Sequence, residues 1–218
     1  MLKRYIPLVI LVGVTLLLVV PIDANAQLGE TSAFLADVSN QYRVTPNVTY
    51  HIASNHENKL DLYVPRNANG PTPVLMYIHG GGWVGGAKEV NVLRILPYLQ
   101  MGWAVVNIEY RLGAVARAPA AVEDGLCALR WVIRNAERYN LDTSRIVTSG
   151  NSAGGHLALT TGMIPASAGL DLECPGSEEL RVAAIINWYG ITDVGDLLEG
   201  PNTRSYAVEW MGSLANRF

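Results

Sequence analysis

The stretch RIVTSGNSAGGHLAL, residues 145–159, decides the fold of this chain. Its first five residues form an apolar run typical of a buried strand, and HLALTTGM (156–163) reads as the body of a helix. Between them, GNSAG (150–154) matches the pattern G-x-S-x-G, in which a serine sits on a sharp strand-to-helix turn. We interpret Ser152 as an exposed nucleophile, and the alternative is a small-residue turn that only packs a strand against a helix.

A second glycine-rich motif, HGGGW at 79–83, follows the apolar run VLMYI at 74–78. Consecutive glycines allow backbone N–H groups to point inward without steric cost. An oxyanion hole requires such donors, aimed at the oxygen that becomes negative during acyl transfer. A phosphate-binding loop is disfavoured, because no G-K-[ST] sequence follows the glycines.

The remaining pattern predicts an α/β fold with a mainly parallel sheet. The runs at 48–52 and 60–64 predict an antiparallel pair joined by the turn ASNHENK, and further apolar runs at 103–110 and 182–190 predict buried strands. Amphipathic helices are expected over 90–101, interrupted by a proline, and over 119–139. A third helix is expected over 152–163, with small residues at first and apolar residues afterwards.

These motifs give the chain a resemblance to a known family. It resembles α/β-hydrolase fold esterases of the hormone-sensitive-lipase-like group, close to secreted carboxylesterases and feruloyl-esterase-like proteins. The matching blocks run in family order over residues 60–193: HGGGW, EYRL, AVEDGLCALRWVIRNAERYNLDTSRI, GNSAGGHLAL and INWYGITD. The resemblance implies ester hydrolysis with Ser152 as nucleophile, and an oxyanion hole made by the N–H groups of Gly81, Gly82 and Ala153. It implies no metal and no cofactor.

A serine nucleophile needs a histidine base and a carboxylate, which in this fold follow the serine in the order Ser, Asp or Glu, His. None of the four histidines suits this role: three precede Ser152, and the fourth lies one helical turn after it (His51, His56, His79 and His156). Asp193 reads as a loop-structuring residue, with the triad acid as its alternative role, and Glu123 and Asp124 read as surface or helix-face charges.

We therefore expect a C-terminally truncated hydrolase domain, with the acid and the histidine beyond Phe218. The run at 182–189 would then be an unprotected edge strand, which favours aggregation. The chain alone should be poorly soluble and nearly inactive. Two other functions stay open: a peptidase or amidase of the same fold, and a non-catalytic binding protein that has lost its base.

Residues 1–26 have the order of a secretory signal peptide: Lys3 and Arg4, an apolar run, and the small-x-small sequence ANA. An uncleaved anchor helix is the alternative. The expected organisation is a signal peptide (1–26) and a partial hydrolase domain (27–218), exported to the periplasm or the extracellular space. An oxidising compartment permits a disulfide between Cys127 and Cys174, although two separate thiols are as plausible.

The net charge of −3 argues against a nucleic-acid partner. The expected partner is a small-molecule ester, without a stable membrane span once the signal peptide is removed. Neither the identity of the ester nor the oligomeric state can be inferred from the residues.

Overall fold

The computed structural model describes residues 30–212, and the expected signal peptide (1–26) lies outside this range. The core is a six-stranded sheet of order β1-β2-β4-β3-β5-β6. Strand β2 is antiparallel to β1 and β4, whereas β4, β3, β5 and β6 run parallel. This confirms the predicted sheet. Its strands are β1 Tyr42–Ala53, β2 His56–Pro65, β3 Thr72–Ile78, β4 Ala104–Ile108, β5 Leu141–Asn151 and β6 Ala184–Trp188.

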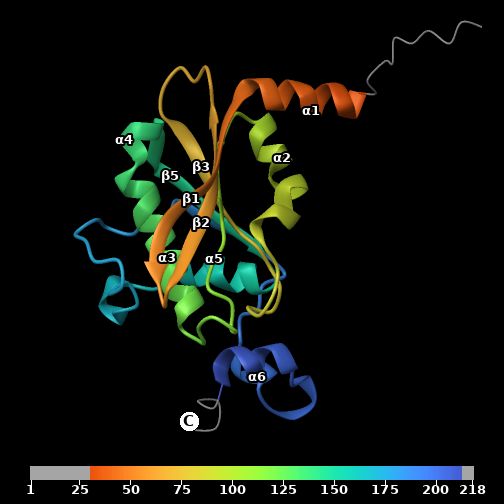
Figure 1. The fold of residues 1–218 in the computed structure, drawn as a ribbon, viewed down its shortest axis with the longest axis vertical. Helices are drawn as coiled ribbons and strands as arrows, with labels where there is room; N and C mark the ends of the chain where they lie inside the picture. The colour runs from red at the N-terminus through yellow and green to blue at the C-terminus, as the bar shows by residue number, and fades with distance from the viewer. Residues whose placement is uncertain (1–29, 213–218) are drawn as a thin grey trace, which may run out of the picture.

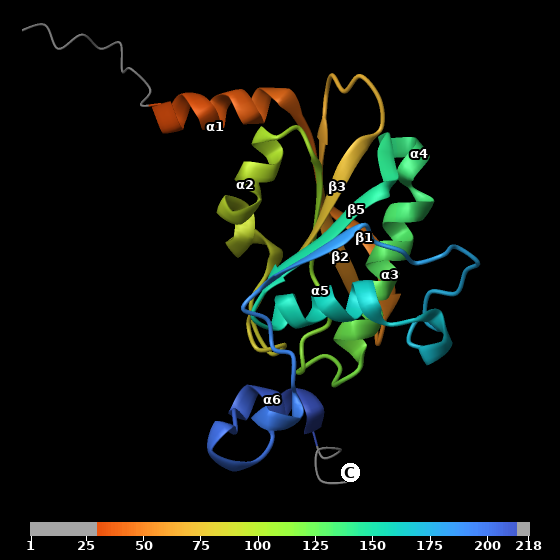
Figure 2. The ribbon, with the colours of Figure 1, turned by 180° about the vertical axis from the view of Figure 1, so that it is seen from behind.

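Helices cover both faces of the sheet (Figure 1). Helix α2 packs on one face, and α3 and α5 pack on the other, which is clearest from behind (Figure 2). Helix α6 lies beyond the end of the sheet at which β5 stops. The helices are α1 Glu30–Gln41, α2 Val92–Gln100, α3 Ala120–Arg134, α4 Ala136–Tyr139, α5 Ala153–Met163 and α6 Ser205–Met211, with 3-10 turns at Lys88–Asn91, Ala166–Ala168, Gly195–Leu197 and Gly200–Asn202.

Strand β3 explains why its sequence is apolar without alternation. Val74, Met76 and Ile78 contribute to the larger core cluster, which also contains residues of α3 and α5. Leu75 and Tyr77 belong to a second cluster with residues of α2. A strand buried on both faces needs apolar side chains at successive positions, because these point to opposite faces.

Two element boundaries differ from the sequence-based prediction. The first hairpin turns through only two residues, Ser54 and Asn55, with φ values of 52° and 56°. Two positive φ angles are typical of a type I′ turn, which suits the strand twist, so both strands extend into the predicted loop. The helix predicted over 119–139 is interrupted at Asn135, whose φ and ψ of −101° and 8° end α3 before α4 begins.

The loop between α5 and β6 is fixed to α3. A disulfide joins Cys127 on α3 to Cys174 in this loop, which settles the question that the sequence left open. Arg130 Nη1 lies 2.8 Å from Glu178 Oε2, and Arg134 Nε lies 2.6 Å from Glu178 Oε1. The loop therefore follows α3 closely although it carries no long helix or strand.

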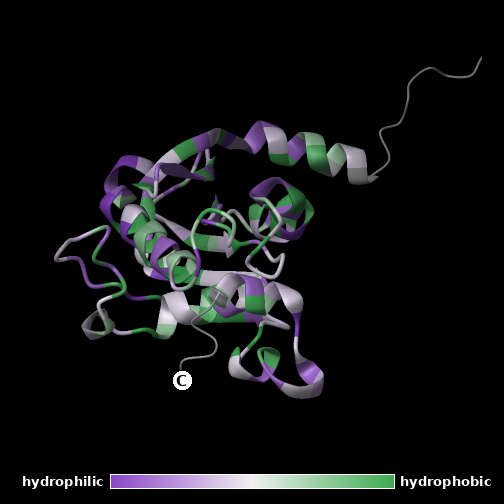
Figure 3. Cartoon of the chain, turned by 60° about the horizontal axis from the view of Figure 1, so that its bottom comes forward, coloured by the Kyte–Doolittle hydropathy of each residue, from purple (hydrophilic) through white to green (hydrophobic). Residues whose placement is uncertain are grey.

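Strand β6 is an edge strand within the described chain, as predicted, since it pairs there with β5 alone. The helices carry both hydrophobic and hydrophilic residues, as amphipathic helices that cover a sheet do (Figure 3). Within residues 30–212, no helix has both the length and the apolar content that crossing a membrane requires.

Candidate active site

Ser152 sits between β5 and α5 with strained backbone angles. Its φ of 53° and ψ of −122° lie in a region that residues with a side chain rarely adopt. Its N–H donates to the carbonyl of Trp188 at 3.0 Å, which ties the turn to the end of β6. Its hydroxyl does not cap α5. Strain of this kind is concentrated at functional sites, where the surrounding structure enforces it.

The glycines on either side of Ser152 are required by close backbone packing. A Cβ atom on Gly150 would lie 2.5 Å from the carbonyl oxygen of Ile78. One on Gly154 would lie 2.5 Å from the carbonyl oxygen of His79. Real Cβ atoms do not approach backbone atoms so closely. The end of β3 therefore passes directly against the turn, as the sequence argument requires.

The loop that follows β3 carries a run of positive φ angles: 129° at Gly81, 60° at Gly82 and 61° at Trp83. Gly80 packs against the turn, since a Cβ there would lie 2.6 Å from the carbonyl oxygen of Asn151. Within residues 30–212, the N–H groups of Gly81, Gly82 and Ala153 donate to no backbone carbonyl. The two glycine-rich motifs thus meet at one place, with backbone donors left available beside Ser152.

His79 fixes the base of this loop. Its Nδ1–H donates to the carbonyl of Gly80 at 2.8 Å, and its ring stacks on Tyr110 with 4.4 Å between ring centres. The Tyr110 hydroxyl donates to the carbonyl of His79 at 3.2 Å. Burial lowers the pKa of His79, so the ring is neutral at neutral pH. His79 therefore holds the glycine loop in place through hydrogen bonds and ring stacking.

Trp83 connects the glycine loop to α5 and α6. Its fully buried indole donates from Nε1 to Nδ1 of His156 at 3.2 Å. The indole also stacks on Trp210 of α6, with 4.3 Å between ring centres and 12° between the planes. The His156 ring meets both indoles edge-on. The sequence-based prediction includes Trp83 only as part of the HGGGW motif and does not select Trp210, because no local pattern links residues this far apart.

The partly buried His156 ring should make stability depend on pH. Burial lowers the pKa of His156 to about 4, whereas the unfolded chain has a value near 6.5. As the pH falls, the unfolded state therefore binds a proton before the folded state does. The stabilisation of the folded state by the neutral His156 ring is fully present above pH ~6.5 and is lost as the pH falls toward 4. We expect this loss to reduce the free energy of unfolding by up to about 3 kcal/mol between pH 7 and pH 4.

Urea unfolding of the wild type and of His156→Gln across this pH range measures the effect. Glutamine can still accept the Trp83 hydrogen bond but does not titrate, so the variant should show a flatter dependence. Equal pH dependence in the two proteins would contradict the assignment.

The described structure contains all four histidines, and no ring nitrogen of any of them hydrogen-bonds to the Ser152 hydroxyl. His79 and His156 bond to Gly80 and Trp83, and His51 Nε2 lies 3.3 Å from Glu173 Oε2. His56 begins β2, in the first hairpin. Asp193 Oδ1 accepts from the N–H of Asp196 at 3.3 Å, in keeping with a loop-structuring role.

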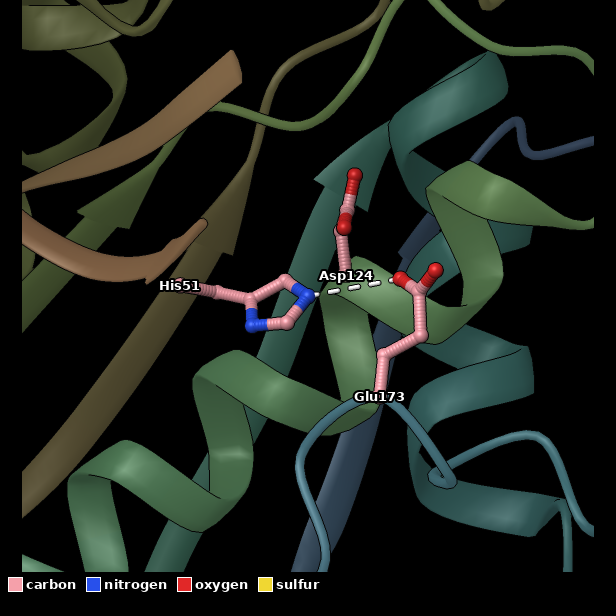
Figure 4. Close-up of side chains that lie close together, drawn as sticks. All are labelled: His51, Asp124 and Glu173. Atoms are coloured by element: carbon pink, nitrogen blue, oxygen red, sulfur yellow. Dashed lines mark hydrogen bonds and ion pairs between the residues drawn. The ribbon is translucent and has the colours of Figure 1, made fainter. Parts of the chain in front are cut away.

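Three titratable side chains form a separate cluster, in which the ligand atoms of His51, Asp124 and Glu173 lie within 4.8 Å of one another (Figure 4). The prediction that Asp124 is a surface or helix-face charge is wrong, because its side chain is fully buried. It accepts from Arg111 Nε at 2.9 Å and from the Arg111 N–H at 2.7 Å. Arg111 Nη2 also lies 2.7 Å from Glu173. The arginine supplies the positive charge that these carboxylates need.

Comparison with known proteins identifies similar chains. A family model described as BD-FAE matches residues 60–217. Esterase LipC of Mycobacterium tuberculosis is 32% identical over 127 residues, which are 58% of this chain and 32% of that protein. Versiconal hemiacetal acetate esterase of Aspergillus parasiticus is 40% identical over 105 residues, which are 48% of this chain and 32% of that protein.

Solved structures show the same fold. Thermogutta terrifontis esterase 2 phosphoramylated by tabun is 26% identical with a TM-score of 0.62, over 79% of this chain and 62% of that chain. A truncated form of a carbohydrate esterase from gut microbiota is 29% identical with a TM-score of 0.61, over 72% of this chain and 60% of that chain. The chain spans about a third of the length of these curated relatives.

Proposed function

Because this chain belongs to the BD-FAE family, whose model matches residues 60–217, we propose that it serves the hydrolysis of carboxylic esters through an acyl-enzyme on Ser152. The observation that carries the proposal is the strained backbone of Ser152 on a turn packed directly against the glycine loop. The esterases among its relatives support the same reaction class.

The proposed reaction begins with attack of Ser152 Oγ on the ester carbonyl, while a base takes the hydroxyl proton. The carbonyl oxygen becomes negative in the tetrahedral intermediate, and the N–H groups of Gly81, Gly82 and Ala153 stabilise it. Each such donor contributes roughly 2.7–4 kcal/mol to the barrier reduction. As the intermediate collapses, the base returns this proton to the leaving oxygen, which expels the neutral alcohol and leaves the acyl-serine. Water then attacks the acyl-serine, which releases the acid and restores the Ser152 hydroxyl.

We further propose that none of the four histidines of this chain is the base. Each of them has one ring nitrogen engaged elsewhere or lies on the first hairpin. Ser152 would then be oriented but not activated. A general base contributes roughly 10²–10⁴-fold to the rate, so the 218-residue chain should be a poor esterase.

Chemical rescue tests both parts of this proposal. We expect the 218-residue chain to hydrolyse p-nitrophenyl acetate slowly, and added imidazole to raise the rate at least about tenfold above that of Ser152→Ala in the same buffer. The Ser152→Ala chain corrects for hydrolysis by imidazole itself. Ser144→Ala, which changes an exposed serine on the same strand, should retain the rescue.

The outcomes separate the two claims. Fast hydrolysis that depends on Ser152 without imidazole would mean that a histidine of this chain is the base. If imidazole gives no rate that depends on Ser152, and a fluorophosphonate probe does not label Ser152, the esterase proposal fails and a binding protein becomes the better interpretation.

A further inference from the structure

A groove of about 580 Å³ lies between α2, the segment that follows α2, and the strands β3 and β6. We call it the Arg94 groove. Neither Ser152 nor the glycine loop lines it, so it is separate from the proposed catalytic machinery. Its volume falls in the range of sites that bind small molecules.

Half of the residues that line the Arg94 groove are aromatic: Tyr77, Tyr98, Trp103 and Trp188. Tyr98 and Trp103 pack edge-on, with 5.9 Å between ring centres. Trp188 is 50% exposed, and it stacks on no other aromatic ring of residues 30–212. An accessible indole offers a broad apolar face on which another aromatic ring packs favourably. The groove therefore favours a ligand with a flat aromatic body.

Arg94 supplies the only charge among the described residues that line the groove. It is exposed, and it forms no ion pair with a carboxylate in the described part of the chain. Hydrogen bonds with the hydroxyls of Tyr189 and Tyr77 raise the pKa of Arg94, so its guanidinium lies beside the Tyr77 hydroxyl. Because these neighbours are neutral, the positive charge of Arg94 is left for a ligand.

The charge of the lining selects the charge of the ligand. A guanidinium without a carboxylate partner binds a carboxylate through two parallel N–H···O bonds. The larger cavity between α3, α5 and α6 has the opposite character, since its one charged lining residue is Glu199. Charge complementarity thus favours an anion at the Arg94 groove, and the aromatic walls favour a carboxylate attached to a ring.

We propose that the Arg94 groove binds an aromatic carboxylate, with the carboxylate on the Arg94 guanidinium and the ring against Trp188. Binding requires no reaction at Ser152, so the proposal stands apart from the proposed function. Two lining residues also bond to the serine turn: the Trp188 carbonyl accepts from the Ser152 N–H at 3.0 Å, and the Tyr77 hydroxyl donates to Asn151 Oδ1 at 3.2 Å. An occupant would therefore contact residues that hold this turn.

Binding of three probes to the 218-residue chain tests the proposal. 2-Naphthoate has both a ring and a charge, 2-naphthamide has the ring without the charge, and hexanoate has the charge without the ring. We expect 2-naphthoate to bind about fivefold more tightly than either of the others at low ionic strength. Because Arg94 is exposed, the advantage over 2-naphthamide should shrink as salt is added. Calorimetry measures the affinities, and 2-naphthoate should shift the Trp188 indole resonance in ¹H–¹⁵N spectra.

Variants assign the probes to the groove. Arg94→Gln keeps a polar side chain but removes the charge, so 2-naphthoate should then bind no more tightly than 2-naphthamide. Trp188→Leu removes the indole face and should weaken both naphthyl probes, while the backbone bond to Ser152 is kept. Arg138→Gln is the matched control, because Arg138 is also exposed and lies over an aromatic ring, that of Tyr139, but does not line the groove.

Equal affinity for 2-naphthoate and 2-naphthamide would overturn the proposal, as would unchanged 2-naphthoate binding in Arg94→Gln. Hexanoate that binds as tightly as 2-naphthoate would also overturn it, because the aromatic walls would then contribute nothing. Sedimentation tests whether a second copy is seated in the groove instead, and dimers that exclude 2-naphthoate overturn the proposal. If Trp188→Leu does not fold, the three probes and Arg94→Gln decide the outcome, since Arg94 lies at the surface.

Discussion

Gly154→Ala is expected to destabilise this chain by about 3 kcal/mol or more, which is severe for the addition of one methyl group. The φ angle of Gly154 is not positive, so alanine could adopt its backbone conformation. The cost is steric: the new Cβ would lie 2.5 Å from the carbonyl oxygen of His79 and 2.7 Å from its carbon. Backbone atoms at the end of a central strand cannot move aside cheaply. Urea unfolding measures the loss.

Gly70→Ala is the matched control for this change. A Cβ there has no heavy atom within 4 Å, and its φ is not positive. The substitution should be neutral or stabilise the chain by up to about 1 kcal/mol, because alanine reduces the entropy of the unfolded chain. If Gly154→Ala unfolds at the wild-type urea concentration, the packing of β3 against the serine turn is not as described.

Asp124→Asn is expected to reduce the free energy of unfolding by about 3 kcal/mol. The carboxylate is fully buried and faces the buried guanidinium of Arg111. Breaking a buried ion pair by neutralising one partner leaves the other charge without compensation. Glu173 and Glu123 also contact Arg111 and would retain part of the compensation. The urea midpoint at neutral pH measures the effect.

Two variants define how the Asp124 effect arises. Glu179→Gln disrupts an exposed pair with Arg181 at 3.6 Å and should cost less than about 1 kcal/mol. The double change Arg111→Met with Asp124→Leu removes both buried charges and should be more stable than Asp124→Asn. A double variant less stable than the single one would show that packing, rather than the uncompensated charge, explains the loss.

Local sequence patterns were sufficient to predict the fold class and the strained turn at Ser152. Alternation, apolar runs and glycine positions depend on residues close in sequence, and each glycine identified beside Ser152 proved to be required by backbone contact. The same reasoning misjudged Asp124. A charged residue on an amphipathic helix resembles a surface residue unless its partner is known, and Arg111 lies in a different segment.

The sequence by itself determined the order of strands and helices, the strained turn at Ser152 and the glycine loop, since these follow from steric rules that act over a few residues. The signal peptide and the position of the base stay predictions. Only the tertiary structure decided the contacts between distant segments: the bond from Trp83 to His156, the stacking of Trp83 on Trp210, the ion pair of the buried Asp124 with Arg111 and the bond between Cys127 and Cys174. Such contacts depend on how helices pack on the sheet, which no local pattern specifies.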